Sequence, residues 1–182
     1  PRYDFYWPET LVRWRTEGFA GDVHAAHERL GVDLSPVAWS WPVPFPGREE
    51  VVREDAETKV VRGSMGKLER VWKARSGTPE HLAFDCDSRA KWEKEYKPAL
   101  LATGLSPGLT VQGGRESFAK ARGRGRFAVL QGVESFEAMR QLVGDEILLV
   151  AMMEDPDWVR DMSATYTDLI LRDFQALHDG GV

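Results

Sequence analysis

The sequence predicts an α/β protein in which helices and an antiparallel β-sheet precede a region with a parallel sheet. Three observations carry this prediction. The chain of 182 residues is 42% hydrophobic, which is enough to bury a core in about one domain. Short apolar runs separated by polar turns fill residues 51–72 and indicate antiparallel strands. Residues 116–143 alternate instead between helical and strand patterns, which is typical of a parallel sheet.

Composition excludes several classes of function. The 24 basic and 29 acidic residues give a formal net charge of -5, so the chain lacks the basic excess that nucleic-acid binding needs. The single cysteine, Cys86, excludes an internal disulfide and fits a reducing compartment. The longest apolar run, residues 147–153, is far shorter than the roughly 20 residues of a membrane-spanning helix. We therefore expect a cytoplasmic protein that binds neither nucleic acid nor membrane.

Two short helices are predicted before the strands. Pro8 suits the first turn of a helix over residues 7–14, whose apolar residues recur at helical spacing. Asp22 suits the N-cap of a second helix that ends at Gly31. Residues 32–47 then alternate prolines with large apolar side chains, which favours an extended path or an edge strand.

The next segment predicts a three-stranded antiparallel meander. Its strands are expected at residues 51–53, 59–62 and 68–72, with polar or glycine-containing turns between them. Residues 82–84 indicate a further short strand.

The C-terminal region has a different organisation. A glycine-rich segment marks an internal boundary, so we expect an N-terminal cap region over residues 1–110 and a βα region over residues 111–182. The elements predicted after the boundary are a helix at 116–121, a strand at 127–130, a helix at 135–143, an apolar helix from Asp145 and a long final helix from Asp155.

The order of several motifs resembles the uroporphyrinogen decarboxylase superfamily. The motifs are Trp-Pro-Glu-Thr at 7–10, Gly-Val-Asp at 31–33, Glu-Glu-Val at 49–51, Leu-Val-Gly at 142–144 and Met-Glu-Asp-Pro-Asp-Trp-Val at 153–159. The resemblance implies the N-terminal portion of a TIM (β/α)8 barrel of uroporphyrinogen decarboxylase type, preceded by two helices and an antiparallel β meander. The strand at 127–130 is then the first strand of the barrel.

The resemblance is closer to the corrinoid-dependent methyltransferase-like branch than to authentic uroporphyrinogen decarboxylase. The decarboxylases carry an Arg-Gln-Ala-Gly-Arg-Tyr stretch near the N-terminus, whose arginines face the acidic substrate. Residues 3–9 read Tyr-Asp-Phe-Tyr-Trp-Pro-Glu here and cannot form bidentate contacts with carboxylates. Complete members of the methyltransferase branch use zinc and a corrinoid, and their zinc ligands lie in the second half of the barrel. We therefore expect no cofactor within this chain.

A (β/α)8 barrel typically takes about 250 residues, so we expect a truncated domain. An incomplete parallel sheet exposes an apolar edge, which soluble proteins usually cover. We expect a homo-oligomer or a second chain that completes the barrel, a small-molecule or corrinoid ligand, and no methyl transfer by the chain alone. Two alternatives stay open: a non-enzymatic half-barrel module for binding or assembly, and a decarboxylase of a porphyrinogen.

Two candidate ligand-binding residues follow the strand at 127–130. Gln131 and Glu134 lie at the carboxyl end of this strand, where barrel enzymes bind their substrates. The alternative is structural: Gln131 satisfies loop backbone groups, and Glu134 adds a favourable negative charge to the first turn of the next helix.

A second candidate set, Asp4, Tyr6, Trp7 and Glu9, approaches the barrel mouth by resemblance. Its aromatic and acidic side chains can stack on and hydrogen-bond a planar ligand, such as a methoxylated aromatic compound or the edge of a corrin. The alternative is a helix-entry segment in which Trp7 packs onto Leu11.

The sequence identifies no catalytic residue and no metal site. His24 and His27 share a helical face, but a catalytic zinc needs a third protein ligand, which the sequence does not clearly supply. Cys86 lies between two aspartates whose negative charge raises the pKa of a thiol, so a nucleophilic role is disfavoured.

Overall fold

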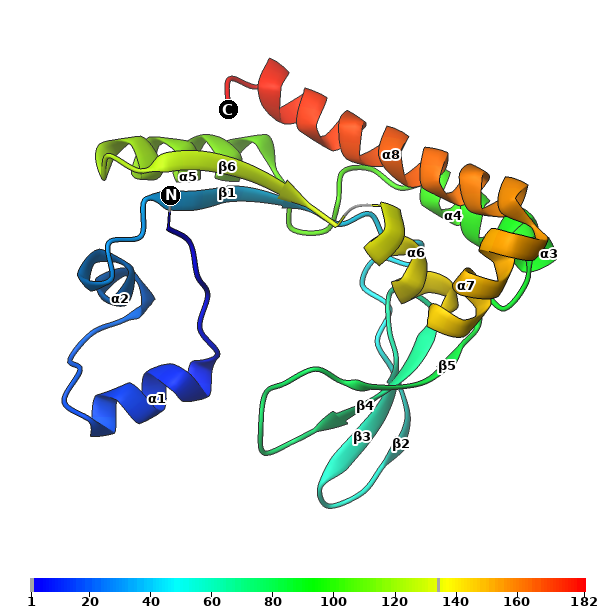
Figure 1. The fold of residues 1–182 in the computed structure, drawn as a ribbon, viewed down its shortest axis with the longest axis horizontal. Helices are drawn as coiled ribbons and strands as arrows, with labels where there is room; N and C mark the ends of the chain where they lie inside the picture. The colour runs from blue at the N-terminus through cyan, green and yellow to red at the C-terminus, as the bar shows by residue number, and fades with distance from the viewer. Residues whose placement is uncertain (1, 134) are drawn as a thin grey trace.

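The computed structural model describes residues 2–133 and 135–182, which form an α/β structure with two separate β-sheets (Figure 1). The first sheet is a parallel pair of β1 (Leu34–Ser40) and β6 (Phe127–Gly132). The second sheet is antiparallel, with the strand order β2-β3-β4-β5. The α/β class and the presence of both sheet types are thereby confirmed.

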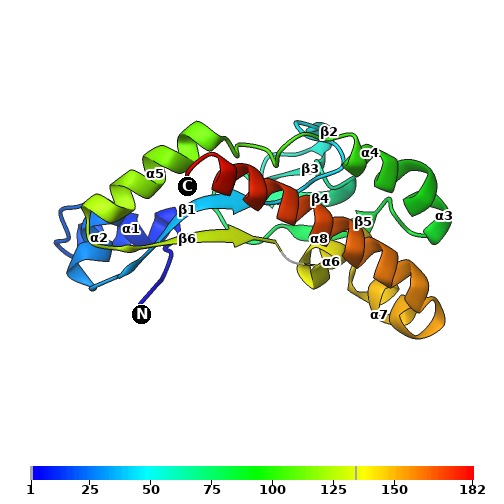
Figure 2. The same cartoon turned by 90° about the horizontal axis from the view of Figure 1, so that it is seen from above.

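The two N-terminal helices begin where the sequence predicts. Helix α1 (Pro8–Thr16) has Pro8 in its first turn, and the Asp22 side chain caps α2 (Val23–Arg29) by accepting a hydrogen bond from the Ala25 amide at 3.0 Å. Both helices lie at one end of the molecule, far from α3 and α7 at the opposite end (Figures 1 and 2).

The proline-rich segment forms strand β1. It pairs with β6 in parallel, so the strand predicted as the first of a barrel has a parallel neighbour that precedes it by about 90 residues in the chain. The register shifts between Pro36 and Ala38, which is expected because proline has no N–H to donate. The parallel sheet therefore combines one strand from residues 1–110 with one from residues 111–182.

The antiparallel sheet has four strands in the described chain, where the sequence predicts a meander of three. They are β2 (Glu50–Glu54), β3 (Thr58–Arg62), β4 (Lys67–Trp72) and β5 (Glu80–Phe84). The fourth strand corresponds to the short run predicted at 82–84, extended by two residues that pair with β4. The sequence pattern predicts this strand too short because only two of its five residues, Leu82 and Phe84, are large and apolar.

The main core lies under the helices of the second half. A helical segment made of α3 (Arg89–Lys91), a π-helical turn (Trp92–Tyr96) and α4 (Lys97–Leu101) packs with α6 (Ser135–Val143), α7 (Asp145–Glu154) and α8 (Pro156–Asp179). Helix α5 (Val111–Gly123) packs instead on both strands of the parallel pair. Helix α8 buries the predicted stripe of Trp158, Met162, Tyr166, Leu169, Ile170 and Leu177. The indole Nε1 of Trp92 donates to Asp161 at 2.8 Å and fastens the helical segment to α8.

Candidate functional site

A cleft of about 560 Å³ opens beside the carboxyl end of β1, and we call it the tryptophan cleft. Three indole rings line it, from the entry to α1, from β1 and from the residue after β1. The remaining walls come from the segment that leads into β5, from β4 and β5, from α6, and from the loops that carry Val43, Ser64, Met65 and Pro107. The lining side chains used below are Trp7, Trp39, Trp41, Lys67, Glu69, Pro79, His81, Pro107 and Gln141.

Strand β1 and the residue after it present two of the tryptophans. Trp39 is half-exposed on β1, whereas Trp41 packs partly against the core. Ser40 lies between them, and because side chains alternate along an extended chain, it faces the opposite side. Ser40 is fully buried there and donates to Asp173 Oδ2 at 2.8 Å.

Asp173 supports the cleft from behind. Its carboxylate is fully buried. The Oδ2 atom accepts hydrogen bonds from the hydroxyls of Ser40 and Ser106, and from the Ser106 amide at 3.3 Å. Ser106 precedes Pro107, which lines the cleft. Helix α8 thus holds both the end of β1 and the loop that carries Pro107, and we call these three residues the Asp173 hub.

Trp7 reaches the cleft from the start of α1. Glu9, two residues later, accepts hydrogen bonds from the Ser76 amide at 2.6 Å and from the Ser76 hydroxyl. Both bonds lower the pKa of the exposed Glu9 carboxyl, and the bond from the Ser76 hydroxyl has the larger effect. They tie α1 to the segment that leads into β5, so Trp7 and Pro79 share a wall.

A polar network forms the wall opposite the indoles. The Lys67 side chain is almost fully buried, and its ammonium contacts Glu69 Oε1 at 2.8 Å, His81 Nε2 at 3.1 Å and the side-chain oxygen of Gln141. Lysine is rarely buried unless it is paired, so these contacts are what allow Lys67 to lie here. We call Lys67, Glu69, His81 and Gln141 the polar wall.

His81 is neutral in this wall. Burial, and then the charge of Lys67, lower the pKa of its imidazole. An ammonium can only donate hydrogen bonds, so Nε2 of His81 is the acceptor, and we assign the ring proton to Nδ1. Glu69 Oε1 lies slightly farther from Nε2, at 3.3 Å.

The N-terminal candidates separate in the structure. Trp7 lines the tryptophan cleft and Glu9 fixes a neighbouring segment. Tyr6 packs instead on Trp14 and His27, with ring centroids at 4.9 and 5.6 Å, and the Asp4 carbonyl contacts His27 Nε2 at 3.1 Å. Asp4 and Tyr6 therefore belong to the packing between α1 and α2.

The candidates after β6 are less informative. Gln131 is paired in register with Trp39 on the neighbouring strand, but it is absent from the described lining of the cleft. Glu134 lies outside the described residues.

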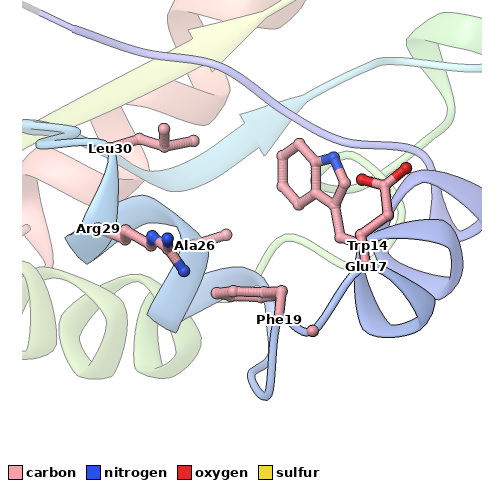
Figure 3. A pocket seen from close by; sticks show the side chains of 7 residues that line it. Trp14, Glu17, Phe19, Ala26, Arg29 and Leu30 are labelled. Carbon is pink, nitrogen blue, oxygen red and sulfur yellow. The ribbon is translucent and has the colours of Figure 1, made fainter.

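A second hollow of about 300 Å³ separates α1 from α2. Figure 3 shows Trp14 and Glu17 on one side of it and Phe19, Ala26, Arg29 and Leu30 on the other. Glu17 is already bonded to Arg13 at 2.8 Å, and none of the described polar residues on this lining is buried. This hollow therefore offers less chemistry than the tryptophan cleft.

The described side chains favour neither a metal site nor a reactive cysteine. Residues 2–133 and 135–182 contain no group of three histidine, cysteine or acidic side chains placed to hold a metal ion. His24 contacts Arg124 at 3.2 Å, while His27 contacts Asp4, so the two rings have separate partners. Burial, and then the charge of Asp87, raise the pKa of Cys86 to about 12.

The sequence could not identify the polar wall because its members come from three elements. The available signal was the i, i+2 spacing of Lys67 and Glu69, which puts both on one face of β4.

Across the described part of the chain, no helix is both long and apolar enough to cross a membrane. Comparison with protein-family models, curated proteins and solved structures gives no match for this chain.

Proposed function

We propose that this chain is a uroporphyrinogen decarboxylase-like protein of the methyltransferase-related branch, and that it binds a flat organic substrate in the tryptophan cleft. The observation that carries the proposal is the position of three indole rings beside the carboxyl end of a parallel strand. Barrel and doubly wound α/β enzymes bind ligands at this end of their strands.

The size and lining of the cleft favour a small ring compound. Its volume lies within the range of roughly 300–1,000 Å³ that is typical of small-molecule sites. Each aromatic pair formed with a ligand ring adds about 0.5–1.5 kcal/mol beyond the burial of apolar area. Lys67 is the one cation in the described lining, and it is already paired, which disfavours a polycarboxylate such as a porphyrinogen.

The residues of the cleft do not fit the cofactors of complete family members. A corrinoid is larger than the drug-sized ligands that a cleft of this volume encloses. Zinc would need a set of ligands that the described side chains do not form. The proposed contribution of this chain is therefore substrate binding, and we assign no chemical step to it.

Assembly is the second part of the proposal. Among the described strands, β1 and β6 pair only with each other; the Leu34 amide at the start of β1 also bonds the Arg2 carbonyl at 3.3 Å, and each strand has an outer edge with no described strand beside it. We propose that a second copy or another chain covers these edges and that methyl transfer requires it. The same observation favours one alternative, a non-enzymatic module that assembles through the sheet edge.

Isothermal titration with 3-methoxybenzamide, a flat uncharged probe, tests substrate binding. We expect Trp39→Ala to weaken binding at least tenfold because it removes a half-exposed ring from the cleft. The control is Phe127→Ala, which removes an aromatic ring that is 70% exposed at the amino end of β6. Equal losses in both variants would contradict the assigned site.

Native mass spectrometry of the purified chain tests assembly. We expect a dimer or a complex with a second chain. A monomer that still binds the probe would contradict the assembly proposal and leave the binding site intact.

A further inference from the structure

We infer that the tryptophan cleft selects an uncharged ring compound bearing a hydrogen-bond acceptor over the corresponding carboxylate, an inference that rests on the proposed substrate-binding function. Two features of the lining carry it: the polar wall already satisfies its own cation, and one donor of the wall and one on Trp41 have no described partner.

The ammonium of Lys67 has no proton left for a ligand. A lysine ammonium has three donors. Its three partners are oxygens of Glu69 and Gln141 and the Nε2 atom of His81. A ligand carboxylate would have to displace one of these partners from a side chain that is only 6% exposed.

The charge of the wall is balanced before any ligand binds. Lys67 and Glu69 form an ion pair, and His81 is neutral. A carboxylate entering the cleft would meet the negative charge of Glu69, whose side chain is 21% exposed, without a free cation to compensate. Repulsion between like charges is stronger in such a partly desolvated site than in water. An uncharged ligand avoids this repulsion.

Two donors on cleft-lining side chains have no described partner. Nε1 of Trp41 is buried and makes no hydrogen bond within the described structure. Nδ1 of His81, which carries the ring proton in our assignment, likewise has no hydrogen bond among those described. A buried unsatisfied donor is unfavourable, so a ligand oxygen that accepts from Trp41 Nε1 would stabilise the complex. Nδ1 of His81 belongs to a side chain that is 25% exposed, so there a ligand oxygen can accept in place of water. Ether, amide and phenol oxygens can serve.

Two isosteric probes separate charge from shape. We expect 3-methoxybenzamide to bind the full chain at least tenfold more tightly than 3-methoxybenzoate at pH 7.5 in isothermal titration. The two molecules share the ring and the methoxy group and differ in the charge of one substituent. Because the measurement uses the unmodified chain, it does not depend on whether a variant folds.

Glu69→Gln tests the explanation. The substitution leaves the charge of Lys67 unbalanced, so we expect the benzoate to bind at least fivefold more tightly and the benzamide to change less than twofold. The control is Glu80→Gln, which removes one negative charge from β5 on the same sheet, where Glu80 pairs with Arg70 at 2.6 Å outside the cleft.

Each result has a distinct meaning. Equal affinities, or tighter binding of the benzoate, would overturn the selectivity and leave substrate binding in place. Preference for the benzamide without a gain for benzoate in Glu69→Gln would overturn charge balance as its cause. No binding of either probe at millimolar concentration would overturn both the selectivity and the proposed function.

Discussion

Asp173 and Lys67 are both buried charges, but their surroundings differ. Asp173 is fully buried; its Oδ2 atom accepts from uncharged donors of Ser40 and Ser106, and the guanidinium of its chain neighbour Arg172 lies 3.5 Å from Oδ1. Lys67 is held by the side chains of a glutamate, a histidine and a glutamine, and it lies on the wall of a cleft. The Asp173 hub therefore joins elements of the fold, whereas the polar wall presents chemistry to a ligand.

The difference predicts different costs of substitution. Removing a buried charge that organises backbone elements leaves several polar groups without partners. Removing a charge at the edge of a cleft leaves groups that water can still reach. Stability should therefore depend more on Asp173 than on Lys67, and ligand binding should depend on both.

The largest effect is expected for Asp173→Ala. The substitution leaves the buried hydroxyls of Ser40 and Ser106 without their acceptor, and we expect a loss of about 3 kcal/mol in the free energy of unfolding. Urea unfolding followed by circular dichroism measures it. Asp168→Ala, on the exposed face of the same helix, is the control and should change stability by less than about 0.5 kcal/mol. Similar losses in the two variants would show that the hub does not organise the fold.

An intermediate effect is expected for Lys67→Met. Methionine keeps an unbranched side chain that is one atom shorter but leaves Glu69 without its cation, so we expect a loss of about 2 kcal/mol. Adding Glu69→Gln should recover part of this loss, because the double variant no longer holds an unpaired charge. The same urea titration measures both proteins. Failure of the double variant to recover stability would mean that the packing of Lys67 matters more than its charge.

The sequence predicts the helices well because their signals are local. Asp22 and Asp155 cap the helices that follow them, and the helix predicted at 135–143 has those bounds in the structure. Strand pairing is different, since β1 and β6 are brought together by contacts between residues about 90 positions apart. Prolines in β1 indicate an edge strand but carry no information about its partner.

The candidate site was predictable only in part. Trp7 was selected from the sequence and lies on the cleft, whereas Tyr6, its neighbour, faces Trp14 because successive side chains in an extended segment point to different sides. Lys67 and Gln141 are 74 positions apart, and neither forms a recognisable motif. The i, i+2 spacing of Lys67 and Glu69 is the local signal of the site, and it carries no information about the His81 and Gln141 side chains that complete the wall.

The smallest effect is expected in the pH dependence of stability. The pKa of His81 is lowered below its ordinary value of 6.5, so the unfolded chain binds more protons than the folded chain in a window below pH 6.5. The contribution of His81 to stability is fully present above this pH and decreases as the pH falls through the window. We expect His81→Gln to flatten the rise in the free energy of unfolding between about pH 5 and pH 7, measured by urea titration at each pH. The free energy of unfolding of His81→Gln should still depend on pH in this range, because burial also lowers the pKa of His27.

Lys67→Met sharpens this last prediction. The positive charge of Lys67 is the second-largest cause of the lowered pKa of His81, after burial, so its removal should raise that pKa toward 6.5 and narrow the window. The pH slope of Lys67→Met should then lie between those of the unmodified chain and His81→Gln. A slope equal to that of the unmodified chain would show that the ammonium of Lys67 does not govern the protonation of His81. That result would also contradict the assignment of His81 Nε2 as the acceptor of the hydrogen bond from Lys67.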